Sequence, residues 1–270
     1  MMRLQDVRFT YPSAEKPALN DVTLEIEPLS WTVISGPDGS GKTTLSRLLK
    51  GLLTPDSGTI TLAEDPATSV GYVGGDPYDW LIGLTVEEDV AFGLESQQLS
   101  AEEMCTRVAQ AVERTGLSGM EKRLTHTLSG GEQQKVALAG ILALGCRVVI
   151  LDEALNMIDL PTRRSIRRMI AGLRSDLGLT VVEVTNRLAE ALSGDRIVFL
   201  SEGSIRFDGL PHDILPTRMG RDWLEAASGM EGFSGALFQR GLLPVFQVEP
   251  VHVTSALLKL LSGKLTISEK

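Results

Sequence analysis

The chain has 270 residues, a hydrophobic fraction of 43% and a formal net charge of −9. This length and composition predict one large folded domain, or a domain with an appendage, and exclude a disordered chain. The acidic balance argues against a broad nucleic-acid-binding face, so we predict no nucleic-acid partner. Cys105 and Cys146 fit no metal or redox spacing, and we expect two reduced thiols, as in a cytoplasmic protein.

The first quarter of the chain is predicted to form strands around one helix. Alternating apolar residues predict antiparallel strands at 7–11 and 22–26, each with one wet face. A short buried strand is predicted at 31–35. The helix that follows carries leucines on one face and ends near Gly51, where a left-handed residue costs little. Two further short strands are predicted, at 59–62 and 70–73.

The middle of the chain, from 85 to 144, has a helical pattern that begins with a capping box at Thr85. A fully apolar strand follows at 148–151, of the kind buried in a parallel sheet, and another buried strand is predicted at 180–185. A hairpin is expected over 197–207. Because strands and helices alternate through the core, the predicted fold class is α/β with a helical insertion. Further helices are predicted at 101–115, 160–173 and 254–261.

One stretch carries a complete phosphate-binding pattern. After the buried strand at 31–35, residues 36–43 match G-x-x-x-x-G-K-[ST]. Glycines let successive backbone N–H groups point at phosphate oxygens, and the helix N-terminus adds its positive dipole. Lys42 is expected to reach the β- and γ-phosphates, and the Thr43 hydroxyl to reach Mg²⁺. Asp38 is an oddity there, because a carboxylate would repel phosphate unless it points away.

Two other stretches carry chemistry. The strand at 148–151 ends in Asp152, which can hold Mg²⁺, and in Glu153, which can orient and deprotonate an attacking water. Two solvated acids at a strand end are the plain alternative. Ser129-Gly130-Gly131 opens a helix, and Ser129 with Glu132 forms a capping box. Paired glycines weaken a helix start, yet they suit a phosphate that approaches bare N–H groups.

Together the phosphate loop, the Leu-Ser-Gly-Gly-Glu stretch and the Val-Val-Ile-Leu-Asp-Glu stretch resemble the ATP-binding subunits of ABC transporters over roughly residues 3–210. The resemblance implies a P-loop NTPase core with a mixed sheet, an antiparallel β subdomain and a helical insertion. It implies ATP and Mg²⁺ as cofactors. We therefore expect an ATP-binding domain at 1–211, with the insertion at about 76–144, and a small C-terminal extension at 212–270.

The resemblance also implies roles for individual residues. ATP is expected between the phosphate loop of one chain and the Ser129 stretch of a second ATPase chain, in a head-to-tail dimer that drives a transmembrane partner. Tyr11 aligns with the aromatic residue that stacks on adenine, although it could equally be a core tyrosine at a strand end. Asp159 aligns with an aspartate that communicates across the dimer. The catalytic residues would be Glu153 and Lys42, the metal ligands Thr43 and Asp152, and the nucleotide contacts Tyr11, Gly36, Asp38, Gly39, Ser40, Gly41, Lys42, Thr43, Thr44, Ser129, Gly130, Gly131 and Asn186.

A narrower resemblance, to energy-coupling-factor ATPases that serve uptake of vitamins or metal ions, rests on Gly71-Tyr72-Val73, Asp76-Pro77 and the stretch 84–93. The N-terminus lacks a signal-peptide pattern, and the most apolar run, 136–146, is too short to span a bilayer. We therefore expect a cytoplasmic chain that is held at the inner face of the membrane by transmembrane subunits.

Two positions depart from the family pattern. Gly75 stands where a glutamine normally touches Mg²⁺ and water, and Asn186 stands where a histidine normally contacts the γ-phosphate. Asn156 stands where serine is usual. These departures predict a chain that binds ATP but hydrolyses it slowly, which favours a heterodimer over a homodimer; neutral drift in a working enzyme is the alternative. Two other functions stay open: a regulatory or scaffold ABC protein with little hydrolysis, and a soluble ABC ATPase without a membrane partner.

Overall fold

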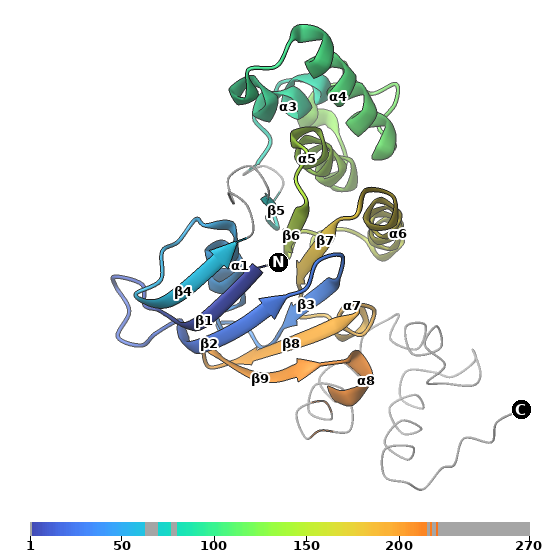
Figure 1. Ribbon diagram of the computed structural model, residues 1–270. Coiled ribbons are helices and arrows are strands. Elements are labelled where there is room, and N and C mark those ends of the chain that lie inside the picture. Colours follow the sequence, from blue (N-terminus) through green and yellow to red (C-terminus); the bar gives the residue numbers. More distant parts are fainter. Residues whose placement is uncertain (1, 63–69, 77–79, 215–216, 218–219, 221–270) are drawn as a thin grey trace, which may run out of the picture.

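The computed structural model describes residues 2–62, 70–76, 80–214, 217 and 220. Within these residues, a three-stranded antiparallel sheet and a six-stranded mixed sheet pack on helices (Figure 1). The expected α/β fold with an antiparallel subdomain is confirmed. The helix predicted at 254–261 and almost all of the extension predicted at 212–270 lie outside the described residues.

The antiparallel sheet has the order β2-β1-β4. Its strands alternate buried and exposed residues, as predicted for a sheet with one solvent-exposed face. The first strand was predicted to begin at Val7, but it begins at Met2 and ends at Phe9. A register shift after Leu4, with Asp6 at a φ of 51°, explains the error, because it breaks the alternation in the sequence. The strands are β1 (Met2–Phe9), β2 (Leu19–Ile26) and β4 (Ser57–Leu62).

The six-stranded sheet has the order β5-β6-β7-β3-β8-β9. All neighbouring strands run parallel except β8 and β9, which form the predicted hairpin. All five residues of β3 and of β7 are buried, as predicted for these strands, and the buried residues include polar ones such as Thr32 and Glu183. The strands are β3 (Trp31–Ser35), β5 (Val70–Val73), β6 (Val148–Asp152), β7 (Thr180–Val184), β8 (Arg196–Ser201) and β9 (Ser204–Gly209).

Two apolar clusters cover the two faces of this sheet. One joins the antiparallel sheet and the leucines of α1 to Ile150, Val182 and Val198. The other joins α5 and α6 to Val149, Val181 and Ile197. Because neighbouring strand residues point to opposite faces, each strand contributes to both clusters. The sheet therefore forms a rigid middle layer between α1 on one side and α5 and α6 on the other.

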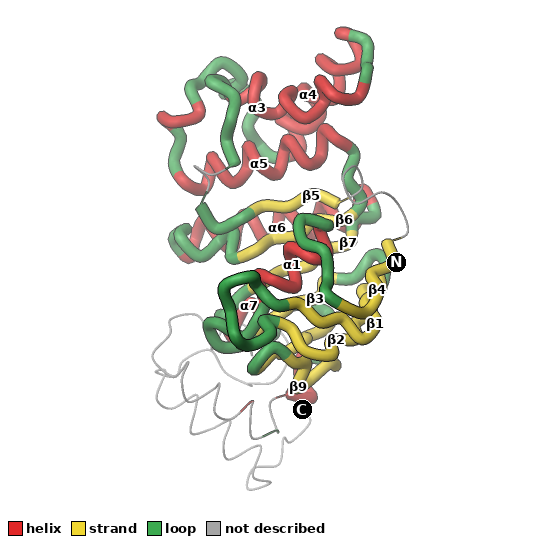
Figure 2. The backbone as a smooth tube through the Cα atoms, turned by 90° about the vertical axis from the view of Figure 1, so that its left-hand side faces the viewer, coloured by secondary structure: helices red, strands yellow, loops and turns green. Residues whose placement is uncertain are grey.

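The helices α3, α4 and α5 share a third apolar cluster at the end of the molecule away from the antiparallel sheet (Figures 1 and 2). Both predicted capping boxes are present, at Thr85 and Ser129. The helix predicted to end at 173 continues to Leu177, where Gly178 stops it with a φ of 66°. The helices are α1 (Lys42–Lys50), α3 (Val86–Phe92), α4 (Ala101–Arg114), α5 (Gly130–Leu144), α6 (Leu160–Leu177), α7 (Leu188–Ala191) and α8 (Pro211–Ile214), with 3-10 turns η2 (Gly93–Gln97) and η3 (Thr125–Thr127).

None of the helices in the described part of the chain combines the length and the apolarity that a membrane span requires.

Candidate nucleotide site

The residues singled out by the sequence gather at the carboxyl ends of β3, β6 and β7. These strands are parallel neighbours, with Ile34 opposite Val184 and Asp152 opposite the same Val184. The register therefore brings the phosphate loop after β3, Glu153 after β6 and Asn186 after β7 to one edge of the sheet. This edge is where open α/β sheets bind their ligands.

Glycine is required at two positions of the phosphate loop. A Cβ on Gly36 would lie 2.0 Å from the carbonyl oxygen of Leu200, and a Cβ on Gly41 would lie 2.5 Å from that of Ala18. Both glycines also have positive φ angles, 147° and 102°. Gly39, by contrast, has no atom within 4 Å of its Cβ position. The loop is thus tight against the protein at its two ends and open at its tip, as a phosphate cradle must be.

Two side chains in the loop fit an anion. The Lys42 ammonium is buried and donates to the carbonyls of Gly36 and Pro37, at 3.0 Å each. The Ser40 hydroxyl oxygen is buried and, among the described residues, is one of two such side-chain atoms without a hydrogen-bond partner. A phosphate oxygen would satisfy this hydroxyl and the ammonium together. Asp38 points away, as the sequence required: its side chain is 87% exposed, although it lies 3.8 Å from Lys42.

Asp152 is surrounded by hydroxyl groups. It accepts hydrogen bonds from Thr43 Oγ1 at 3.3 Å, from Ser46 Oγ at 2.7 Å and from the Tyr72 hydroxyl at 2.5 Å. Burial, followed by the hydrogen bond to Asp152, raises the pKa of Tyr72 to about 12. Thr43 and Asp152 thus lie together, and their oxygens suit Mg²⁺. Sequence reasoning missed Ser46 and Tyr72, although Ser46 lies one helical turn after Lys42.

Glu153 has a strained backbone. Its φ is 54°, a left-handed conformation that costs a non-glycine residue about 1–3 kcal/mol. Its N–H donates to the carbonyl of Val184, and its carboxylate accepts a hydrogen bond from Asn156 Nδ2 at 3.1 Å. The Cβ position of Gly75 lies 3.4 Å from the Glu153 carbonyl oxygen, so residue 75 is beside the predicted base. Asn186 is exposed.

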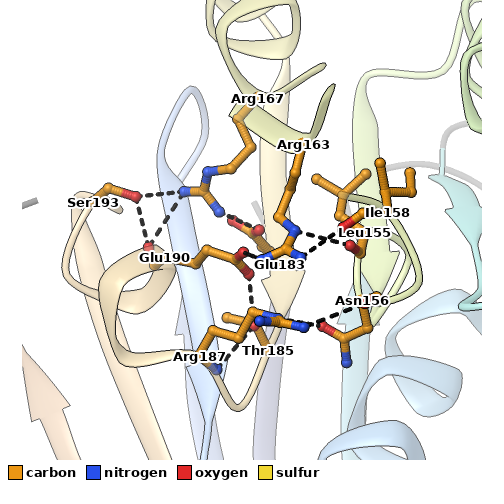
Figure 3. Close-up of polar contacts among 10 residues, drawn as sticks. All are labelled: Leu155, Asn156, Ile158, Arg163, Arg167, Glu183, Thr185, Arg187, Glu190 and Ser193. Atoms are coloured by element: carbon orange, nitrogen blue, oxygen red, sulfur yellow. Dashed lines mark hydrogen bonds and ion pairs between the residues drawn. The ribbon is translucent and has the colours of Figure 1, made fainter. Parts of the chain in front are cut away.

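A buried ion pair fixes the loop that follows Glu153. Arg163 donates to the Glu190 carboxylate at 2.9 Å and to the carbonyls of Leu155 and Ile158 (Figure 3). Glu190 also accepts from Thr185 Oγ1 at 2.9 Å, directly before Asn186. The loop after β6 and the segment after β7 are therefore tied together below the site. Nothing in the sequence patterns pointed to this pair.

Tyr11 lies at the edge of the phosphate-loop helix. Its hydroxyl is 3.2 Å from Thr44 Oγ1, and its ring packs edge-on against Phe9 with centroids 4.9 Å apart. Its position beside the loop is compatible with both roles that the sequence left open, and adenine stacking stays a prediction.

Ser129, Gly130 and Gly131 lie at the N-terminus of α5. Ser129 caps the helix, and its N–H and hydroxyl donate hydrogen bonds to the Glu132 carboxylate, which lowers the pKa of Glu132. A Cβ on Gly131 would lie 2.5 Å from the methyl group of Thr162, whereas Gly130 has open space around it. Gly131 is therefore needed for packing on α6, a reason that the sequence did not disclose, whereas Gly130 and Ser129 are exposed.

Comparison with known proteins agrees with this geometry. The model of the ABC transporter family matches residues 19–156. An energy-coupling factor transporter ATP-binding protein EcfA1 from Lacticaseibacillus paracasei is 38% identical over 256 residues, which cover 90% of this chain and 91% of that one. EcfA1 from Lactobacillus delbrueckii subsp. bulgaricus is 40% identical over 222 residues, 78% of this chain and 79% of that one.

Solved structures give the same answer. CbiO1 from Clostridium perfringens, part of the ABC transporter complex CbiONQ, superposes with a TM-score of 0.75 at 26% identity, covering 88% of this chain and 98% of that one. The ATP-binding cassette MJ0796, in a post-hydrolysis state bound to ADP and Pi, gives 0.70 at 27% identity, over 78% and 99% of the two chains.

These matches confirm the predicted ATPase activity and the predicted ATP and Mg²⁺ at the level of the family. They support a transporter subunit and not the scaffold or non-transport alternatives. The chain therefore belongs to the ABC transporter family, among the ATP-binding proteins of the energy-coupling-factor type.

Proposed function

We propose that this chain is an ATP-driven motor subunit for micronutrient uptake, held at the inner face of the membrane by transmembrane subunits. The observation that carries the proposal is the phosphate loop: a buried Lys42 and an unpartnered Ser40 hydroxyl face a cradle next to Asp152. Lys42 and the loop amides would bind the phosphates, Thr43 and Asp152 would hold Mg²⁺, and Glu153 would take the proton of the attacking water. The EcfA1 names of the relatives support the transport role.

We further propose that the chain works as the weaker half of a heterodimer. Its own site offers no side chain at Gly75 and no ionisable group at Asn186. Its Ser129-Gly130-Gly131 stretch, at the N-terminus of α5, matches the family pattern and would complete the site of a second, different ATPase chain. Losing one preorganised group at a phosphoryl-transfer site costs about 10²–10³ in rate, so the two departures together predict slow hydrolysis.

Single-turnover ATP hydrolysis by the purified chain tests the proposed catalytic site and its slow rate. We expect tight binding of ATP, slow hydrolysis, and faster hydrolysis in the double variant Gly75→Gln/Asn186→His, by roughly 100-fold or more. The glutamine fits, because Gly75 has no left-handed φ and the nearest atom to its Cβ position, the Glu153 carbonyl oxygen, is at an ordinary contact distance of 3.4 Å. Adding Glu153→Gln to the double variant should remove the gain. The proposal of an asymmetric site would be contradicted if the unmodified chain hydrolysed ATP rapidly and Glu153→Gln abolished that hydrolysis.

The partner proposal has its own measurement. The tagged chain, extracted from membranes in mild detergent, should carry with it a polytopic membrane protein and a second ATPase of different mass. Recovery of the chain only as a homodimer would contradict the heterodimer.

A further inference from the structure

The carboxylate of Glu153 is connected to a cation through one amide side chain. Asn156 Nδ2 donates to Glu153 Oε2 at 3.1 Å, and Asn156 Oδ1 accepts from Arg187 Nε at 3.4 Å. Arg187 Nη2 donates in addition to the Asn156 carbonyl at 3.3 Å (Figure 3). Hydrogen bonds therefore connect the Arg187 guanidinium, through the Asn156 amide, to the carboxylate of the predicted general base.

The chemistry of the two ends fixes the amide in one orientation. A guanidinium only donates hydrogen bonds and an ionised carboxylate only accepts them. The oxygen of Asn156 must therefore face Arg187, and its NH₂ group must face Glu153. Leucine, which has a similar volume, would serve neither end. Aspartate would still pair with Arg187, but it would place a second negative charge beside Glu153.

Arg187 and Asn156 are both held by contacts with the buried core. The Arg187 N–H donates to Thr185 Oγ1 at 3.1 Å, and Thr185 in turn donates to Glu190. Arg163, paired with Glu190, holds the carbonyls on either side of Asn156. Asn156 and Arg187 are themselves half-buried, so their contacts are only partly exposed to competition from water.

We propose that Asn156 and Arg187 are positioning residues that hold the Glu153 carboxylate in one orientation for its work on the attacking water. This inference rests on the proposed function. Gly75 has no side chain that could contact the Glu153 carboxylate, and the left-handed backbone of Glu153 must be stabilised by its surroundings. The Asn156 amide supplies that support from within the chain. A base that is free to rotate would spend less time within reach of the water, and the rate would fall while nucleotide binding stayed the same.

The test compares single-turnover hydrolysis of radiolabelled ATP, followed for hours, with ATP affinity measured on the same proteins. Asn156→Leu and Arg187→Leu should each slow hydrolysis by roughly 10- to 100-fold and leave the affinity unchanged. Arg164→Leu, an exposed arginine on α6, is the matched control and should keep the wild-type rate. Asn156→Gln, which keeps both amide groups, should recover part of the loss.

Two further measurements separate positioning from a structural role. In a Glu153→Gln background, Asn156→Leu should cause no additional loss, because the carboxylate it positions is gone. Asn156→Asp should fail to recover the rate that Asn156→Gln recovers, because its carboxylate has no N–H to donate to Glu153.

Three results would overturn the inference: wild-type rates in Asn156→Leu, an equal loss in the Glu153→Gln background, or a wild-type rate no higher than that of Glu153→Gln. A wild-type chain that binds no ATP would instead refute the proposed function, and it would be seen before any variant is compared.

Discussion

Replacing Arg163 by methionine is predicted to remove about 3–5 kcal/mol from the free energy of unfolding. The side chains of Arg163 and Glu190 are only 8% and 10% exposed, so the change leaves a buried carboxylate without its partner, which costs about that much. It also removes the donors of the Leu155 and Ile158 carbonyls, at 3.0 and 2.7 Å, which places the estimate toward its upper end. With a urea m-value of about 3 kcal/mol/M, the unfolding midpoint should fall by roughly 1–1.7 M.

Urea unfolding followed by tryptophan fluorescence measures this loss. Arg164→Met, the next residue on α6 and an exposed one, is the control and should change the free energy by less than about 0.5 kcal/mol. Combining Arg163→Met with Glu190→Gln removes the unpaired charge, so the double variant should lose less than the sum of the single variants, by about 1 kcal/mol or more. The reasoning fails if Arg163→Met costs no more than Arg164→Met, or if the two single losses simply add.

Three further outcomes follow from the site. Gly36→Ala should abolish ATP binding and lower stability, because the new methyl group would lie 2.0 Å from the Leu200 carbonyl oxygen; unchanged binding in an equilibrium titration would contradict this. In metal-free protein the Tyr72 phenol, with its pKa raised to about 12, keeps its proton while the unfolded chain loses it near 10, so stability should fall as pH rises between these values. Tyr72→Phe should weaken that fall and remove the last step of a 295 nm absorbance titration; an unaltered titration would show that another group is responsible. Ser129→Ala should cost about 1 kcal/mol as a lost helix cap and leave ATP binding by the isolated chain intact, as measured by unfolding and by titration, whereas loss of that binding would mean that Ser129 serves its own chain's nucleotide.

The parts of the fold that could be predicted are those that depend on residues close together in the sequence. The apolar run of β6 and the apolar-rich segments of β3 and β7 identified buried strands, and the glycine pattern identified the phosphate loop. Capping residues marked helix starts at Thr85 and Ser129 because a cap involves only neighbours in sequence. The start of β1 was missed because the irregularity at Asp6 changes the register within one strand.

The contacts that could not be predicted join residues far apart in the chain. Tyr72 reaches Asp152 across 80 positions, and Arg163 reaches Glu190 across 27 positions. No periodicity in the sequence records such a pair, since it depends on how the strands and helices pack. Arg187 carried no signal in the sequence for the same reason: its contacts with Asn156, at 3.4 and 3.3 Å, place it beside the site.

The close approach of Gly131 to Thr162 bears on how signature motifs are interpreted in evolution. A glycine that must be small for the sake of its own subunit will persist even in a lineage that has given up hydrolysis altogether. Persistence at that position therefore reports the architecture of the subunit, whereas the neighbouring Gly130, with empty space around it, is free to diverge once no ligand approaches it. Among descendants of such a protein, the two glycines should therefore be substituted at different rates. Gly130 should be replaced first in lineages where no nucleotide binds opposite it.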